Sequence, residues 1–181
     1  VPSYQRLIRG IKSGGFAAGT VLDAAKPMVV ASIFHTLSRP IVLLCPKPED
    51  ARRLFAELTS YLPDEASIHH YPESEILPYE RMTPDAGIRH QRIGVLSCLR
   101  DPQQGLLNQP IVVTSVVALM QKTLSPECLS KSVVNVEPGD RLDLEEMLSH
   151  WSRMGYRFAP VVEEPGTMSR RGGIIDIFTP G

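Results

Sequence analysis

Phosphate chemistry is the first possibility that the residues raise, because Lys26 stands between a short apolar run and a helical pattern. A phosphate loop needs glycine, four further residues, and then Gly-Lys-Ser or Gly-Lys-Thr, since glycine permits the turns that aim backbone amides at phosphate. In the window "TVLDAAKP", Thr20 and Ala25 replace the two glycines, and Pro27 replaces the hydroxyl residue that would bind magnesium. Proline supplies neither a hydroxyl nor an N–H. The window therefore predicts no nucleotide site.

Other patterns with catalytic precedents are equally incomplete. The segment "GGFAAGT", 14–20, has the glycine spacing but ends in threonine instead of lysine, and "DEAS", 64–67, follows Pro63 rather than a buried strand. His69 and His70 are adjacent, so on a strand they point to opposite faces and cannot share a metal. The sequence has no Gly-x-Ser-x-Gly. We expect no catalytic residue, no cofactor and no metal in these 181 residues.

Basic residues gather in and around one predicted helix. Arg89 and Arg92 are three positions apart and share a face, which could contact phosphate groups of a nucleic acid. A solvated outer face is the favoured interpretation. Trp151, near the end of a later predicted helix, is interpreted as a packing residue.

Composition narrows the class of protein. The net charge is -1, with 19 Lys+Arg against 20 Asp+Glu, so no global basic field favours nucleic acid or an anionic membrane. The three cysteines are far apart in the sequence, and we expect reduced, buried thiols in a cytoplasmic protein. No apolar run approaches the roughly 20 residues of a membrane span. The first residue is Val1 rather than Met, and we expect the chain to be a piece of something larger.

Strand and helix patterns alternate over the first 131 residues. This rhythm predicts an α/β fold: a mostly parallel sheet with helices on both faces. The run 40–45, "PIVLLC", is continuously apolar, as in a strand buried on both faces. Thr83 and Pro84 are the expected N-cap and first residue of the helix that carries Ile88, Ile93, Leu96 and Leu99 inward. The expected helices are 4–12, 27–37, 48–62 and 84–100, the expected strands are 19–23, 40–45 and 67–71, and 110–121 is a strand turning into a helix.

The pattern changes after Pro126. We expect a strand at 132–140, a helix that Asp143 caps together with Glu146 and that Gly155 ends, and strands in 156–162 and 172–178. We place a domain boundary near residue 131, giving domains 1–131 and 132–181. The second is expected to be part of a small α/β domain.

Three stretches carry a family resemblance, namely "YPESEILPYERMTPDAGIRHQRIGVLSCL", "IVVTSVVALMQ" and "GDRLDLEEMLSHWSRMGYRFAPVVEEPGTMSRRGGIIDIFTPG". Together they resemble the N-terminal region of the bacterial transcription-repair coupling factor, which is itself similar to the excinuclease component UvrB. The resemblance implies a degenerate, P-loop-NTPase-like helicase domain followed by a small domain that docks onto the excinuclease component UvrA. It also implies further domains that bind RNA polymerase and translocate on double-stranded DNA with ATP and magnesium.

Within the resemblance, the family pattern of an arginine, a glycine and an apolar-acidic strand falls on Arg171, Gly172 and "IIDIF". The resemblance implies that Arg171 contacts the excinuclease component UvrA, whereas Arg170 has no match to the motif. The residues alone indicate only a solvated arginine at the end of a strand. A glycine pair at 172–173 is expected to allow a kink or a close approach there.

Three rival functions stay open at this point. The chain could be an active ATPase of the UvrB class, which would need nucleotide binding near Lys26. It could be a small α/β enzyme working at the carboxyl ends of its strands. It could also bind DNA through Arg89 and Arg92.

Overall fold

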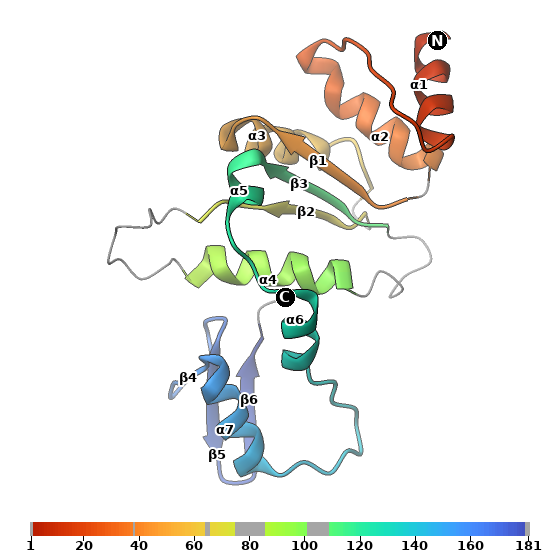
Figure 1. Cartoon of the computed structure of the whole chain (residues 1–181). Coiled ribbons are helices and arrows are strands. Elements are labelled where there is room, and N and C mark those ends of the chain that lie inside the picture. Colours follow the sequence, from red (N-terminus) through yellow and green to blue (C-terminus); the bar gives the residue numbers. More distant parts are fainter. Residues whose placement is uncertain (1, 38, 64–65, 75–85, 101–108, 180–181) are drawn as a thin grey trace. The chain divides into compact units, whose positions relative to one another are not determined.

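In the computed structural model of the protein, residues 2–37, 39–63, 66–74, 86–100 and 109–179 are described (Figure 1). They form two compact units, which we describe separately: Val1–Glu73 with Asp101–Met120, and Ser74–Arg100 with Gln121–Gly181. The first unit contains the helices α1 (Pro2–Lys12), α2 (Lys26–Leu37), α3 (Pro48–Leu58) and α5 (Val116–Met120), the 3₁₀ turn η1 (Asp23–Ala25), and the strands β1 (Ile41–Cys45), β2 (Ile68–Tyr71) and β3 (Ile111–Ser115).

The sheet of the first unit is parallel, with strand order β1-β3-β2. Val112 of the central strand pairs with Val42 on one side and His69 on the other. Parallel strands of one sheet need crossover connections, and α3 lies in the connection from β1 to β2, which flank β3. The predicted α/β class with a parallel sheet flanked by helices is confirmed.

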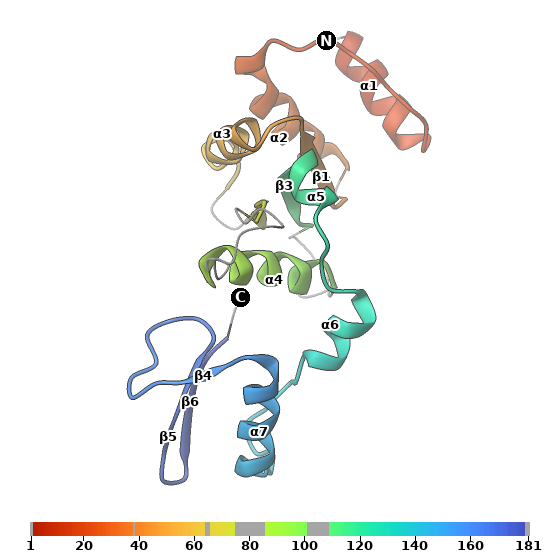
Figure 2. The same cartoon turned by 60° about the vertical axis from the view of Figure 1, so that its left-hand side comes forward.

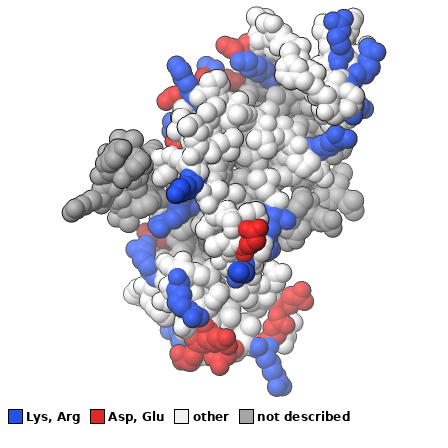
Figure 3. All heavy atoms as spheres, in the orientation of Figure 1, with Lys and Arg blue, Asp and Glu red and all other residues white. Residues whose placement is uncertain are grey.

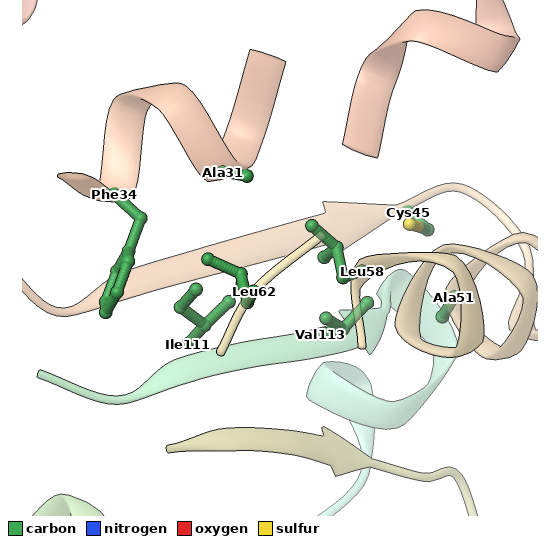
Figure 4. Close-up of a cluster of buried hydrophobic side chains, with 8 residues drawn as sticks. All are labelled: Ala31, Phe34, Cys45, Ala51, Leu58, Leu62, Ile111 and Val113. Atoms are coloured by element: carbon green, nitrogen blue, oxygen red, sulfur yellow. The ribbon is translucent and has the colours of Figure 1, made fainter. Parts of the chain in front are cut away.

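The core of this unit lies between the sheet and the helices α2 and α3 (Figure 4). In α3, Ala51 and Leu58 lie seven positions apart and therefore share a face, and both are completely buried. Figure 4 shows the α3 side chains converging with those of α2 onto β1 and β3. The buried cluster consists of Ala31, Phe34, Cys45, Ala51, Leu58, Leu62, Ile111 and Val113.

Burial differs between the central and the edge strands. The central strand β3 is buried along its whole length. In the edge strand β1, Cys45 faces the core, whereas Val42 and Leu44 are exposed. The expectation that this apolar run is buried on both faces was therefore wrong: as an edge strand, β1 turns only its odd-numbered side chains toward the core, with Cys45 buried and Ile41 and Leu43 partly buried.

The segment before α2 also differs from expectation. The predicted helices at 4–12 and 27–37 are confirmed as α1 and α2, but 19–23 is not a strand, and η1 occupies 23–25 instead. Leu22 is exposed. A short β-branched run forms a strand only where a neighbouring strand can pair with it.

The second unit contains α4 (Ala86–Arg100), α6 (Pro126–Ser132), α7 (Leu144–Met154), β4 (Arg157–Phe158), β5 (Thr167–Arg171) and β6 (Ile174–Phe178). Its small sheet is mixed, in the order β4-β5-β6, with β4 parallel and β6 antiparallel to β5. Asp143 caps α7 by accepting hydrogen bonds from the Glu145 and Glu146 amides, and Gly155 ends it with a φ of +98°. Both of these predicted helix ends are confirmed.

Several predictions for this unit were wrong. The segment 132–140 is not a strand; α6 precedes it, with Ser125 as N-cap and Pro126 as first residue. Val134 and Val136 are exposed and have no neighbouring strand among the described residues. The strand expected in 156–162 is reduced to Arg157–Phe158, and β5 was not predicted. In α4, Leu99 is exposed rather than inward; Thr83 and Pro84 lie outside the described residues.

The structure bears out only some of the expectations drawn from composition. Basic and acidic side chains are interspersed over the face seen in Figure 3. All three cysteines are free, but only Cys45 is buried and Cys128 is exposed, so the expectation of three buried thiols was wrong. Within the part of the chain that the structure describes, no helix has the length and apolarity needed to cross a membrane.

Candidate partner-docking site

The residues implied by the family pattern lie on a β-hairpin. In the β5–β6 hairpin, Arg171 pairs with Ile174, so Gly172 and Gly173 alone form the turn. Gly172 has a φ of +64°, which glycine adopts without the steric cost that a side chain would meet. A Cβ added at either glycine would contact nothing within 4 Å. Gly172 therefore supplies the positive φ of a tight turn. Of the two expected roles, a kink or a close approach, no close approach is found to the described residues.

Side chains alternate between the two faces of the hairpin, so neighbouring arginines point in opposite directions. Arg171 shares a face with its direct partner Ile174 and with Asp176. Arg170 shares the other face with its partner Ile175. In both Figures 1 and 2 the helix α7 runs alongside this hairpin. On the Arg171 side, Thr167 and Ser169 are buried. We call the rest of this side the outer face, defined by Arg171, Ile174, Asp176 and Phe178.

Arg170 binds within its own unit. Its guanidinium forms an ion pair with Glu145 in the first turn of α7, and its Nε donates a hydrogen bond to the Gly172 carbonyl at 3.1 Å. These contacts tie the turn of the hairpin to the helix. With its side chain 38% exposed, Arg170 is the less accessible of the two arginines.

Arg171 faces solvent. Its side chain is 70% exposed, and its Nη2 lies 2.6 Å from Oδ2 of Asp176, whose side chain is 41% exposed. Two exposed apolar residues, Ile174 and Phe178, flank Asp176 at two-residue spacing on the same face. The outer face therefore combines a charged pair with apolar borders, a composition found at protein–protein interfaces.

The base of the hairpin is fixed by backbone and core contacts. Gly166 donates its N–H to the Phe178 carbonyl at 2.8 Å and accepts from the Arg157 N–H at 3.0 Å, which joins β4 to the hairpin. Met168, on the α7 side, is fully buried. The outer face is thus presented from an ordered support.

The position of the incomplete phosphate loop carries an internal ion pair. Lys26 Nζ lies 2.6 Å from Asp23 Oδ1. The hydrogen bond between them lowers the pKa of Asp23 and raises that of Lys26, so both stay charged. Pro27, the next residue, is fully buried. The one lysine left from the pattern is neutralised by a carboxylate one turn away.

The predicted arginine pair on α4 does not form an exposed patch. Arg89 is exposed, but Arg92 is only 8% exposed, and its Nη1 lies 3.4 Å from the side-chain oxygen of Gln121. The interpretation of both residues as a solvated or phosphate-binding face was therefore wrong for Arg92. This polar contact could not be predicted from the local sequence of α4, because Gln121 is 29 residues away from Arg92.

The remaining candidate residues from the sequence, His69, His70 and Trp151, make packing or hydrogen-bond contacts within the fold. His70 is buried beside Phe55, with ring centroids 5.6 Å apart, and His69 hydrogen-bonds Ser67 at 2.7 Å. Trp151 lies beside Tyr156 with ring centroids 6.5 Å apart, in accord with its interpretation as a packing residue. Among the described residues, no group of three or more His, Cys, Asp or Glu side chains could hold a metal ion.

Sequence comparisons relate the segment that carries the hairpin to a known family. The profile of the UvrB interaction domain matches residues 134–181, which include α7 and the whole β5–β6 hairpin. A transcription-repair-coupling factor from Myxococcus xanthus is 33% identical over 162 residues, or 87% of this chain. Those from Bacillus subtilis and Escherichia coli are 27% and 28% identical over 97% and 100% of it.

The fold and these matches define an α/β chain that carries a UvrB interaction domain. The chain is homologous to the N-terminal region of the transcription-repair-coupling factors. It spans 13–15% of the length of these relatives.

Proposed function

We propose that this chain is a non-catalytic adaptor module that recruits the excinuclease component UvrA to stalled RNA polymerase in transcription-coupled nucleotide excision repair. The observation that supports it best is the two-faced hairpin. One arginine, Arg170, is tied to α7, while its neighbour Arg171 is exposed on the other face of the same hairpin. A planar guanidinium so placed suits a bidentate contact with a carboxylate of a partner.

The whole protein is proposed to do more than this chain does alone. As in the coupling factors it resembles, further domains would bind RNA polymerase and double-stranded DNA and translocate with ATP and magnesium, in the cytoplasm. The division of this chain at residue 131 into a degenerate helicase-like domain and a docking domain is part of the same proposal. The alternative, an active ATPase of the UvrB class, finds no support in Lys26, which is paired with Asp23.

The proposal is tested by calorimetric titration of purified UvrA with the chain and two matched variants. We expect Arg171→Ala to weaken binding by about 2 kcal/mol, or roughly thirtyfold, the scale of an interface hot spot. Arg170→Ala removes the same charge from the other face and should leave affinity within about threefold. Equal losses for the two variants, or no loss for Arg171→Ala, would reject Arg171 as the docking residue.

A further inference from the structure

The ion pair on the outer face joins two strands diagonally. Arg171 lies directly opposite Ile174, and Asp176 lies two residues further along β6 on the same face. Diagonal neighbours in a hairpin are about 7–8 Å apart at their Cα atoms, a distance that a long side chain can span. The contact at 2.6 Å therefore requires the Arg171 side chain to lie along the hairpin over β6.

Only part of the guanidinium is used in this contact. Asp176 binds Nη2, while Nε and Nη1 have no hydrogen-bond partner among the described residues. Arginine carries five N–H donors in a fixed planar fork, so holding one nitrogen restricts the directions of the others. The free donors are thus oriented before any partner arrives.

An exposed arginine without such a partner samples many rotamers, and binding must then immobilise it. Arg171 is 70% exposed, and the hydrogen bond to Asp176 is the one that its guanidinium makes with the described residues. The neighbouring Ile174 is itself exposed and lies next to the turn. The acidic residue is the group that restricts the guanidinium.

We propose that Asp176 is a positioning residue: it holds Arg171 in the orientation in which the guanidinium receives an acidic group of the partner. This inference rests on the proposed docking role of Arg171. Asp176 acts through Arg171 and makes no bond to the partner. Asp176 could instead compete with the partner for Arg171, so that their ion pair must break before docking. In that case removing Asp176 would strengthen binding instead of weakening it.

A double-mutant cycle tests the inference with UvrA as the titrant. We expect Asp176→Ala to weaken binding about fivefold, the scale of immobilising one long side chain. In the Arg171→Ala background the same substitution should have no effect, because there is nothing left to position. Asp176→Glu restores the charge and should recover part of the loss. Glu145→Ala removes the acidic partner of Arg170 instead and should leave affinity unchanged.

A second measurement does not depend on binding. In the free protein, ¹⁵N relaxation of the Arg171 Nε–Hε group should report faster motion after Asp176→Ala, while thermal unfolding confirms that the variant is folded. Tighter binding by Asp176→Ala, an equal loss in the Arg171→Ala background, or unchanged Nε motion would each overturn the positioning role while leaving Arg171 as the docking residue. If Arg171→Ala itself has no effect, the docking proposal fails and this inference with it.

Discussion

Lys26 and Asp23 form an ion pair of 2.6 Å where a phosphate loop would need a free lysine. The carboxylate neutralises the lysine, and the residue after Lys26 is a buried proline without an N–H. Because glycine is absent from this segment, its backbone cannot easily form the nest of amides that binds phosphate.

We therefore expect no saturable binding of a fluorescent ATP analogue in the presence of magnesium. The substitution Asp23→Ala removes the ion-pair partner of Lys26. We expect this variant also to show no affinity for the nucleotide, because its backbone is unchanged. Titration by fluorescence anisotropy measures both proteins. Saturable binding that Lys26→Ala abolishes would contradict this and favour the active ATPase alternative.

The two ends of α7 and the presence of the core helices were predictable because their signals are local, whereas the helix predicted over 48–62 ends at Leu58. The Asp143 cap, the Gly155 stop and the apolar stripe of α3 each lie within a few residues of the element they define. The strand predicted at 19–23 was wrong because the propensity of a β-branched run is realised only against a partner strand. The same reason applies to 132–140.

The site was predictable only in part. β5 escaped prediction because its serine and arginines lack the apolar alternation of a strand, although two glycines between two short segments are a hairpin signal. The assignment of Arg171 as a partner-binding residue rested on a family pattern and not on the spacing of residues. Asp176 could not be assigned to it beforehand, since the diagonal contact depends on the register of β5 against β6.

Gly166 offers a test of how α4 packs within the second unit. Its φ is +79°, and an added Cβ would lie 2.9 Å from Nε2 of His90 on α4. We expect Gly166→Ala to lower the free energy of unfolding by about 2 kcal/mol or more, from backbone strain together with the clash. Urea denaturation followed by circular dichroism gives the value.

Two other glycines separate these causes. Gly139 has a φ of +104° with nothing near its Cβ position, so Gly139→Ala should cost only the strain, about 1 kcal/mol. Gly173 has neither feature, and its substitution should be nearly neutral. If Gly166→Ala costs no more than Gly139→Ala, the contact between Gly166 and His90 is not as described.

We expect His70 to make the stability of the folded protein depend on pH. Burial lowers the pKa of His70; the nearby Glu73 raises this pKa and Arg52 lowers it. Its Nε2 is buried without a hydrogen-bond partner among the described residues. In the unfolded chain the pKa of a histidine is about 6.5, which is above the pKa of His70 in the folded protein. The stabilisation of the fold by neutral His70 is therefore complete above about pH 6.5 and is lost as the pH falls.

His70→Phe removes both the titrating group and the unpaired nitrogen. We expect its free energy of unfolding to fall less than that of the parent chain between about pH 7 and about pH 5. His69 and His90 keep part of the acid sensitivity, because burial lowers their pKa as well. Urea titrations across this range measure the slope. The same slope in both proteins would exclude His70 as a source of acid sensitivity.

The docking claim is tested most directly by hydrogen–deuterium exchange of the chain, alone and saturated with UvrA. We expect the partner to slow exchange in the hairpin, at residues 167–178, and to leave the core strand β3, Ile111–Ser115, unchanged. Protection confined to residues 2–73, with the hairpin exchanging as in the free chain, would contradict a docking site at Arg171.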